Sequence, residues 1–101
     1  MILLNTTFII ADPILDIFID WARRIYLPSI EAEGCFNDTL MAKVMAVVEP
    51  GTTSIAIQTR CQTLEQATAW HDNTAAALKD DLSRRFNGQA LFFTTYMEVL
   101  S

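Results

Sequence analysis

The sequence contains few of the residues that form common metal and catalytic sites. It has one histidine, His71, and two cysteines, Cys35 and Cys61, in 101 residues. A second metal ligand on the same helix face would stand three or four residues after His71, where Thr74 and Ala75 lie, so we expect no metal site. Two cysteines make no disulfide framework, which favours a reducing cytoplasm.

Basic residues and glycines are also scarce. Seven Lys and Arg stand against twelve Asp and Glu, giving a formal net charge of −5, so we expect no nucleic-acid partner. The three glycines form no phosphate-binding loop, and we expect no cofactor. No G-x-S-x-G nucleophile pattern occurs, which argues against a serine or cysteine triad. The apolar start is too short to cross a bilayer and lacks a basic leader, so we expect a cytoplasmic protein without a membrane partner.

Apolar residues, by contrast, are abundant. They make up 51% of the chain, against 19% charged residues, which predicts a folded protein. The length suits one domain with one core, spanning 1–101. This apolar fraction is high for so short a chain, and it indicates a second buried surface in addition to the core.

The order of the periodic segments predicts the fold. A first helix is expected to begin at Asp12, as N-cap, with Pro13 in its first turn, and to end at Gly34. A second helix begins with a capping box of Thr63 and Gln66 and runs to about residue 87. Strands are expected at residues 2–11, 39–49, 53–61 and 89–99. The order βαββαβ predicts an α+β, ferredoxin-like fold: a four-stranded antiparallel sheet with two helices on one face.

Residue alternation gives each predicted strand two faces. In the first strand, one face is apolar except for Thr6. We expect the more apolar row of every strand to lie under the helices. These rows are Ile2, Leu4, Phe8 and Ile10; Leu40, Ala42, Val44, Ala46 and Val48; Ile55, Ile57 and Cys61; and Leu91, Phe93, Met97 and Val99.

The opposite rows mix apolar and polar residues. Left bare, they would expose a large apolar patch, which usually marks an interface. Chain length leaves no third layer, so we expect a second copy to cover this face in a sheet-to-sheet homodimer. The candidate interface residues are Leu3, Ile9, Met41, Met45, Val47 and Phe92. The polar residues indicate a cavity at this face for a small-molecule ligand, with candidate residues Asn5, Thr7, Lys43, Arg60, Phe92 and Tyr96.

The reactive side chains favour packing roles. His71 is in register with Ala67 and Ala75 and therefore points toward the sheet. A lone histidine in such a place is more often structural than catalytic. Cys61 precedes the second helix, where a thiol pKa can fall, but its alternation places it on the core face as an inert thiol.

Five short motifs carry a resemblance to a known family. They are NTTF near the start, DWARRIYLPSI in the first helix, IAIQTR in the third strand, RRF at the end of the second helix, and the final FFTTYMEVL. Together they resemble a bacterial domain-of-unknown-function family, DUF4286, over nearly the whole chain. That family is similar to the dimeric α/β barrels, which include antibiotic-biosynthesis-type monooxygenases and haem-degrading enzymes. The resemblance implies a fold and a dimer, and no activity.

The resemblance also bears on histidine chemistry. Haem-degrading members of the wider group pair an asparagine on the first strand with a tryptophan and a later histidine on the second helix. Asn5 and Trp70 match the first two, but His71 directly follows Trp70, so the haem ligand is not matched. Members of the family often carry a histidine where this chain has Tyr26, so a shared histidine-based site is not implied either.

Two functional hypotheses remain from the sequence. The first is a homodimeric small-molecule-binding or interaction protein without catalysis. The second is a cofactor-independent monooxygenase or isomerase of the dimeric α/β barrel type. A strongly shifted pKa in a dry pocket favours the enzyme, whereas a filled interface favours the binding or interaction protein.

Overall fold

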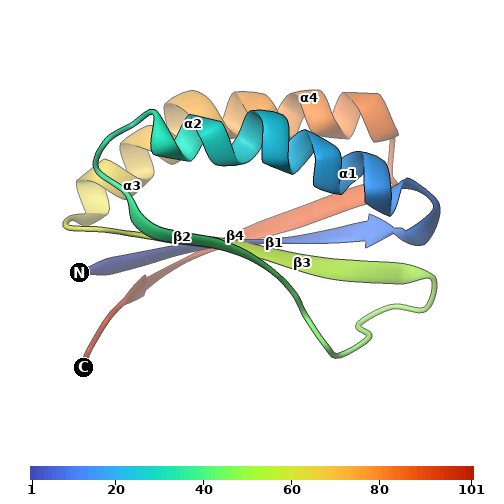
Figure 1. Cartoon of the computed structure of the whole chain (residues 1–101), viewed down its shortest axis with the longest axis horizontal. Coiled ribbons are helices and arrows are strands. Elements are labelled where there is room, and N and C mark those ends of the chain that lie inside the picture. Colours follow the sequence, from blue (N-terminus) through green and yellow to red (C-terminus); the bar gives the residue numbers. More distant parts are fainter.

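One antiparallel sheet carries all the helical segments on one of its faces (Figure 1). The computed structural model describes residues 1–101. The strands are β1 (Ile2–Ala11), β2 (Asn37–Lys43), β3 (Thr52–Cys61) and β4 (Ala90–Glu98), in the spatial order β2-β3-β1-β4. This is the predicted βαββαβ arrangement, and β2 and β4 are its edge strands.

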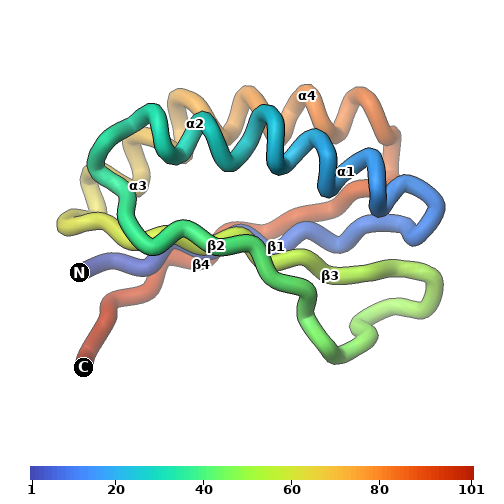
Figure 2. The backbone as a smooth tube through the Cα atoms, in the orientation of Figure 1, coloured from blue at the N-terminus to red at the C-terminus, as the bar shows by residue number.

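The helical layer consists of two segments that cross the sheet in opposite directions (Figure 2). The first comprises a 3-10 turn η1 (Asp12–Ile14), α1 (Leu15–Trp21), a π-helical turn η2 (Ala22–Tyr26) and α2 (Leu27–Glu31). The second comprises α3 (Leu64–Trp70), a π-helical turn η3 (His71–Ala75) and α4 (Ala76–Phe86). Neither segment has the length and apolar character that a membrane-crossing helix needs.

Of the two predicted helix starts, one is confirmed and the other is wrong in its cap. Thr63 Oγ1 accepts a hydrogen bond from the Gln66 N–H at 3.2 Å, and Gln66 Oε1 accepts one from the Thr63 N–H at 3.2 Å, so the capping box is confirmed. The N-cap prediction for Asp12 is wrong, because η1 has Ala11 as its N-cap residue and no side-chain cap. The Asp12 carboxylate instead accepts a hydrogen bond from Thr53 Oγ1 at 2.8 Å, which ties the helix entry to β3.

The π-helical turn η2 changes which residues of the first segment reach the core. A π turn holds more residues than an α turn, so the residue four positions on, rather than three, lies above the first. After Ala22 the core residue is therefore Tyr26, which is 1% exposed, and not Ile25, which α-helical spacing would place on the core face and which is 45% exposed.

The predicted faces of β1 and β3 are confirmed. Leu4, Phe8 and Ile10 of β1 are buried against the helices, and so is Thr6, at 2% exposure. In β3, Ile55, Ile57 and Cys61 form the buried row.

The predicted faces of β4 are wrong. Directly opposed residues of antiparallel strands share a face, and Phe92 pairs with the buried Phe8 while Tyr96 pairs with Leu4. Phe92 and Tyr96 therefore lie under the helices, and Leu91 and Phe93, 53% and 54% exposed, face away from them. The more apolar row is thus the exposed one, so pairing with β1, rather than composition, decides the face.

The prediction for β2 needs two corrections. Met41 pairs with the buried Ile57 and packs against the core, so Leu40 and its row face away from the helices. A register shift near Asp38, whose φ is +53°, accompanies this arrangement. The strand also ends at Lys43, so Met45 and Val47 lie in the connection to β3, where they are 89% and 74% exposed.

Candidate functional site

The most unusual residue of the core is a lysine. Lys79 of α4 is only 2% exposed, and it shares an inward-facing stripe with Ala75 and Leu82. Lysines are almost never fully buried without a charged partner. None of the chain's ion pairs includes Lys79, so its charge lacks a carboxylate counterpart.

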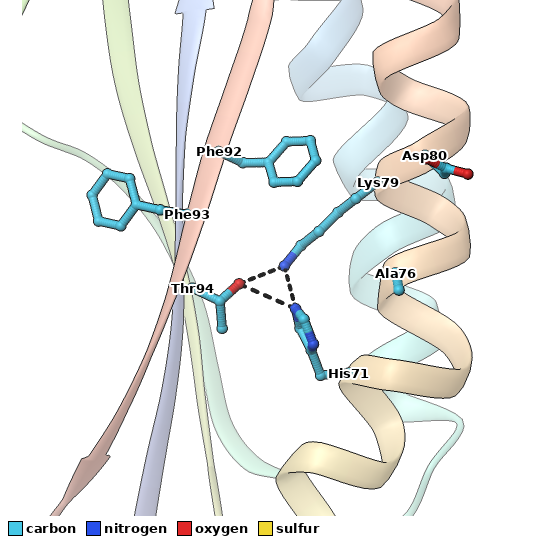
Figure 3. Close-up of a pocket in the computed structure, with 7 residues that line it drawn as sticks. All are labelled: His71, Ala76, Lys79, Asp80, Phe92, Phe93 and Thr94. Atoms are coloured by element: carbon cyan, nitrogen blue, oxygen red, sulfur yellow. Dashed lines mark hydrogen bonds between the residues drawn. The ribbon is translucent and has the colours of Figure 1, made fainter.

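The Lys79 amine contacts three polar side chains from both layers. Nζ donates to Thr94 Oγ1 at 2.6 Å and lies 3.0 Å from His71 Nε2 (Figure 3). It also donates to Thr6 Oγ1 at 3.0 Å. Thr6 and Thr94 are opposed residues of β1 and β4, and their hydroxyls lie 3.0 Å apart. An ammonium group has three hydrogens to donate, and these three neighbours accept all of them.

Burial has a direct effect on this amine. Removal from water disfavours the charged form and lowers the pKa of Lys79 from the ordinary 10.5 to about 8. The three hydrogen bonds satisfy the group's donors, but they do not replace a counter-charge. Lys79 therefore titrates close to neutral pH, where an acid–base or nucleophilic amine is useful.

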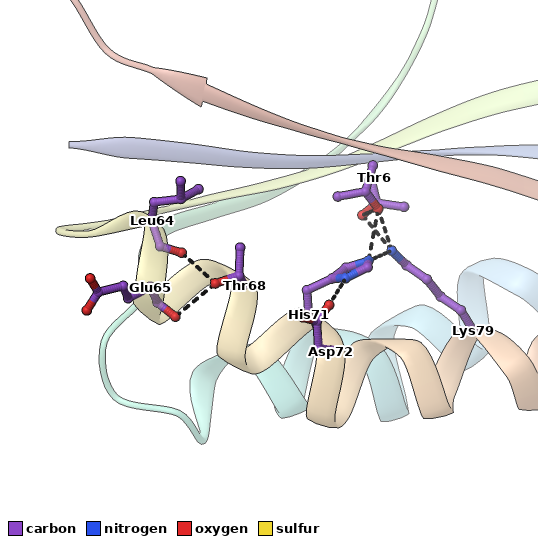
Figure 4. A network of polar contacts seen from close by, with 8 residues as sticks. Thr6, Leu64, Glu65, Thr68, His71, Asp72 and Lys79 are labelled. Atoms are coloured by element: carbon purple, nitrogen blue, oxygen red, sulfur yellow. Dashed lines mark hydrogen bonds and ion pairs between the residues drawn. The ribbon is translucent and has the colours of Figure 1, made fainter.

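His71 connects the amine to the surface. It begins η3 and points toward the sheet, as predicted, with its ring edge-on to Tyr96 at a centroid distance of 6.0 Å. Its Nδ1 lies 3.2 Å from Asp72 Oδ1 (Figure 4). Because a carboxylate accepts hydrogen bonds, the proton of a neutral His71 resides on Nδ1, and Nε2 is left to accept from Lys79.

Tyr26 extends the polar chain into the core. Burial raises the pKa of Tyr26 to about 12, and a side-chain hydrogen bond with Thr6 acts in the opposite direction. Thr6, Lys79, His71 and Asp72 are joined by polar contacts into a path from the core to the surface, and Tyr26 lies next to its inner end. Buried polar networks of this kind are costly unless every member has a partner.

The amine borders a cavity of about 320 Å³ between α4 and the edge strand β4. Phe92 points from β4 toward the helix, and Lys79 Nζ lies 5.5 Å from the centre of its ring. Phe93 points to the opposite side of the strand, and Asp80 is directed away from the amine (Figure 3). The lining residues are His71, Ala76, Lys79, Asp80, Phe92, Phe93 and Thr94. An apolar wall with convergent polar groups is the usual composition of a ligand pocket.

The residues predicted to line a ligand cavity do not come together. Phe92 and Tyr96 lie under the helices, where Phe92 belongs to the cavity just described. The other four lie elsewhere: Asn5, Thr7 and Arg60 point to the helix-free face, and Lys43 ends β2. Asn5 Nδ2 donates to Thr7 Oγ1 at 3.1 Å, so these two polar groups partly satisfy each other.

The predicted interface residues are similarly divided. Leu3 and Ile9 lie on the helix-free face, whereas Met41 and Phe92 lie under the helices and Met45 and Val47 belong to a loop. The helix-free face of the sheet, called the open face below, instead carries large apolar side chains from three strands. These are Leu3, Ile9, Leu40, Leu91, Phe93 and Met97.

Sequence reasoning missed Thr6, Lys79 and Thr94 as site residues, although two signals were present. Thr6 was the one polar residue in an otherwise apolar row, and the structure places it against the Lys79 amine. Lys79 stands four residues after Ala75 and three before Leu82, which is the spacing of one helix face. A lysine on a predicted core face is the signal that would have found the site.

The fold defines a class: it is a ferredoxin-like α+β domain, similar in fold to antibiotic-biosynthesis-monooxygenase-like and dimeric ferredoxin-like proteins. The chain belongs to the family described as a domain of unknown function, DUF4286, whose model matches residues 1–100. No curated protein matches the chain significantly.

Solved structures share this fold at low sequence identity. A putative antibiotic biosynthesis monooxygenase from Deinococcus radiodurans is 14% identical with a TM-score of 0.74, covering 100% of this chain and 94% of its own. A dimeric ferredoxin-like protein from an uncultured marine organism is 12% identical with a TM-score of 0.68, covering 100% and 96%. The de novo designed protein Foldit4 is 7% identical with a TM-score of 0.61, covering 97% of each chain. At these identities the likeness shows the fold alone.

Proposed function

We propose that this protein is a homodimeric small-molecule-binding protein whose ligand occupies the cavity between α4 and β4. The observation that carries the proposal is the buried Lys79 amine, which borders this cavity without a carboxylate partner. A buried charge of this kind costs stability, and proteins retain such groups mainly at functional sites. A ligand oxygen at the amine supplies the missing counterpart.

The lining restricts the chemistry of the ligand. Phe92 offers an apolar wall beside the amine, while Thr94 and His71 present polar atoms at the inner end. This combination suits a small, flat, apolar molecule that carries a carboxylate or carbonyl oxygen. A volume of about 320 Å³ lies at the lower end of the range for small-ligand pockets.

Titration with benzoate, followed by backbone amide NMR, tests the proposal. We expect the largest shift changes at His71, Lys79 and Thr94, because these residues line the inner end of the cavity. Lys79→Met should abolish these changes, whereas Lys43→Met, at the exposed end of β2, should leave them intact. Shift changes confined to the open face, or identical in both variants, would place the ligand elsewhere and refute this cavity.

The homodimer part of the proposal is supported by the open face. Phe93 and Leu91 are about half exposed there, and Leu40 and Met97 are 45% and 39% exposed. Leu91 and Met97 of β4 lie beside Ile9 and Leu3 of β1, and an exposed apolar patch of this kind usually marks an interface. Light scattering of the purified protein measures the outcome directly, and a monomer at tens of micromolar, a rough working concentration for an interface of standard size, would refute it.

A proton-transferring enzyme, such as an isomerase or a cofactor-independent monooxygenase, is the second candidate. It is favoured by the 3.0 Å separation of Lys79 Nζ and His71 Nε2 and by the lowered pKa of the lysine. An enzyme of this kind should accelerate exchange of the α-protons of cyclohexanone with D2O, followed by proton NMR. Equal exchange rates with wild type and Lys79→Met would remove this candidate.

A further inference from the structure

We propose that Lys79 binds its ligand covalently, as an imine formed with an aldehyde or ketone carbonyl. This inference rests on the proposed function, and it names the chemical class of the ligand at the same cavity. The inference rests on the position of the Lys79 amine, which lies at the inner end of an apolar-walled pocket and contacts a proton acceptor, His71 Nε2.

The surroundings of Nζ fit the requirements of an amine nucleophile. Attack on a carbonyl needs the unprotonated amine, and the pKa of about 8 makes that form accessible near neutral pH. Thr6 and Thr94 fix the amine from the sheet side, so that its remaining contact is the 3.0 Å approach to His71. Loss of a proton from Nζ to His71 Nε2 frees a lone pair beside the cavity.

The reaction balances without an oxidant or a cofactor. His71 Nε2 takes one proton from the ammonium group, and the freed electron pair of Nζ forms a bond to the carbonyl carbon. The carbonyl oxygen takes a second Nζ proton to give a carbinolamine. His71 then returns its proton to the hydroxyl group, which leaves as water, and the nitrogen lone pair forms the C=N bond of a protonated imine. Thr94 Oγ1 contacts both groups, at 2.6 Å from Nζ and 3.3 Å from His71 Nε2.

The chain supplies its own reference amine. It has two lysines, and the second, Lys43, is exposed at the end of β2. The α-amine of Met1 is a third amine and is also exposed. Peptide mapping separates all three positions, so the reactivity of Lys79 can be compared with that of Lys43 in the same molecule.

Reductive trapping with benzaldehyde and sodium cyanoborohydride at pH 7 tests the inference. Each reduced adduct adds the mass of the aldehyde less one oxygen atom to the intact protein. At pH 7 an amine of pKa about 8 is unprotonated roughly 300 times more often than one of 10.5. Allowing for restricted access to the cavity, we expect Lys79 to be labelled at least about tenfold faster than Lys43.

Three controls make the result specific. Unfolding in urea should abolish the difference between Lys79 and Lys43, because it removes the burial. Lys79→Met should remove the adduct at Lys79 and keep those at Lys43 and Met1. His71→Gln, which cannot carry the proton, should slow labelling of Lys79 while leaving the rate at Lys43 unchanged.

The outcomes separate this inference from the function on which it rests. Fast, histidine-dependent labelling of Lys79 supports both. Reversible binding of benzoate in the cavity with labelling of Lys79 no faster than of Lys43 overturns the imine and leaves the binding protein standing. Absence of both binding and selective labelling overturns both proposals.

Discussion

Replacing Lys79 by methionine should stabilise the protein at neutral pH. Methionine matches the length and apolar stem of lysine and removes only the ammonium group. The folded protein lowers the pKa of Lys79 by about 2.5 units, from 10.5 to about 8. At 1.36 kcal/mol per unit, keeping this amine charged in the folded state costs about 3 kcal/mol.

The lost hydrogen bonds offset part of this gain. Thr6 and Thr94 keep each other as partners at 3.0 Å, and Thr94 keeps His71 at 3.3 Å, so no hydroxyl is stranded. Losing the amine's contacts should therefore cost only about 1 kcal/mol. We expect Lys79→Met to raise the free energy of unfolding by about 2 kcal/mol at pH 7, and Tm by roughly 8–16 °C for a domain of this size.

The sign of the pH dependence follows from proton binding. Between pH 8 and 10.5 the unfolded chain holds the Lys79 proton and the folded protein does not, so wild-type stability rises with pH through this window. Below pH 8 both states are protonated, and the cost is constant and complete. The advantage of Lys79→Met should thus be full at pH 7 and fall to near zero by pH 10.

Urea unfolding of both proteins at pH 7, 8, 9 and 10 measures this difference. The raised pKa values of Tyr26, Cys35 and Cys61 also change stability at alkaline pH, but both proteins share them, so they cancel in the comparison. Lys43→Met, on the surface, should stay within about 0.5 kcal/mol of wild type at every pH. A Lys79→Met protein less stable than wild type at pH 7, or a difference that does not change with pH, would refute the account of the buried charge.

Three further changes test other parts of the structure. Phe93→Asp places a charge on the open face and should convert a dimer to a monomer by light scattering, whereas Ile25→Asp, on the exposed side of η2, should not. Thr6→Val removes an acceptor from Lys79 and should lower the unfolding free energy at pH 7 by about 1–3 kcal/mol in urea titration; no loss would mean that the hydroxyl is not needed. Thr63→Ala removes the capping box and should cost about 1 kcal/mol in the same assay, and an unchanged midpoint would contradict the role of the cap.

The order of elements could be predicted from the sequence because each local signal agreed with the fold. The capping box at Thr63 and the apolar row of β1 both correspond to features of the structure. Where one strand face was clearly more apolar than the other, as in β1 and β3, alternation also gave the correct face. In these segments burial of the apolar row decides the orientation, and that row is visible in the sequence.

The faces of β2 and β4 could not be predicted in the same way. In β4 both rows contain large apolar residues: Phe92 and Tyr96 alternate with Leu91 and Phe93. Composition favours the row of Leu91 and Phe93, but the register with β1 buries the row of Phe92 and Tyr96. In β2 the shift near Asp38 reverses the alternation, and a bulge leaves no reliable mark in a single sequence.

The candidate site was missed for a different reason, since residue type was given more weight than position. Lysine is a surface residue by type, and no rule based on composition places one under a helix. Only the juxtaposition of Thr6, Thr94 and His71, from three separate elements, makes the buried position of Lys79 tolerable. Such long-range complementarity is a property of the folded chain. The sequence marks Lys79 by its place on the core face of a helix, but it does not show which side chains meet its amine.

The fold itself does not require a lysine at this position. The same architecture recurs in a designed protein that is only 7% identical to this chain, so many sequences satisfy it. An apolar residue at position 79 would fill the space between Ala75 and Leu82 without a desolvation cost. The chain instead keeps a cation there, surrounds it with three acceptors and leaves a cavity beside it. Lys79 thus lowers stability without a packing reason, and it lies beside an open pocket, which is expected of a functional residue. We therefore look for the ligand at Lys79 rather than at the open face.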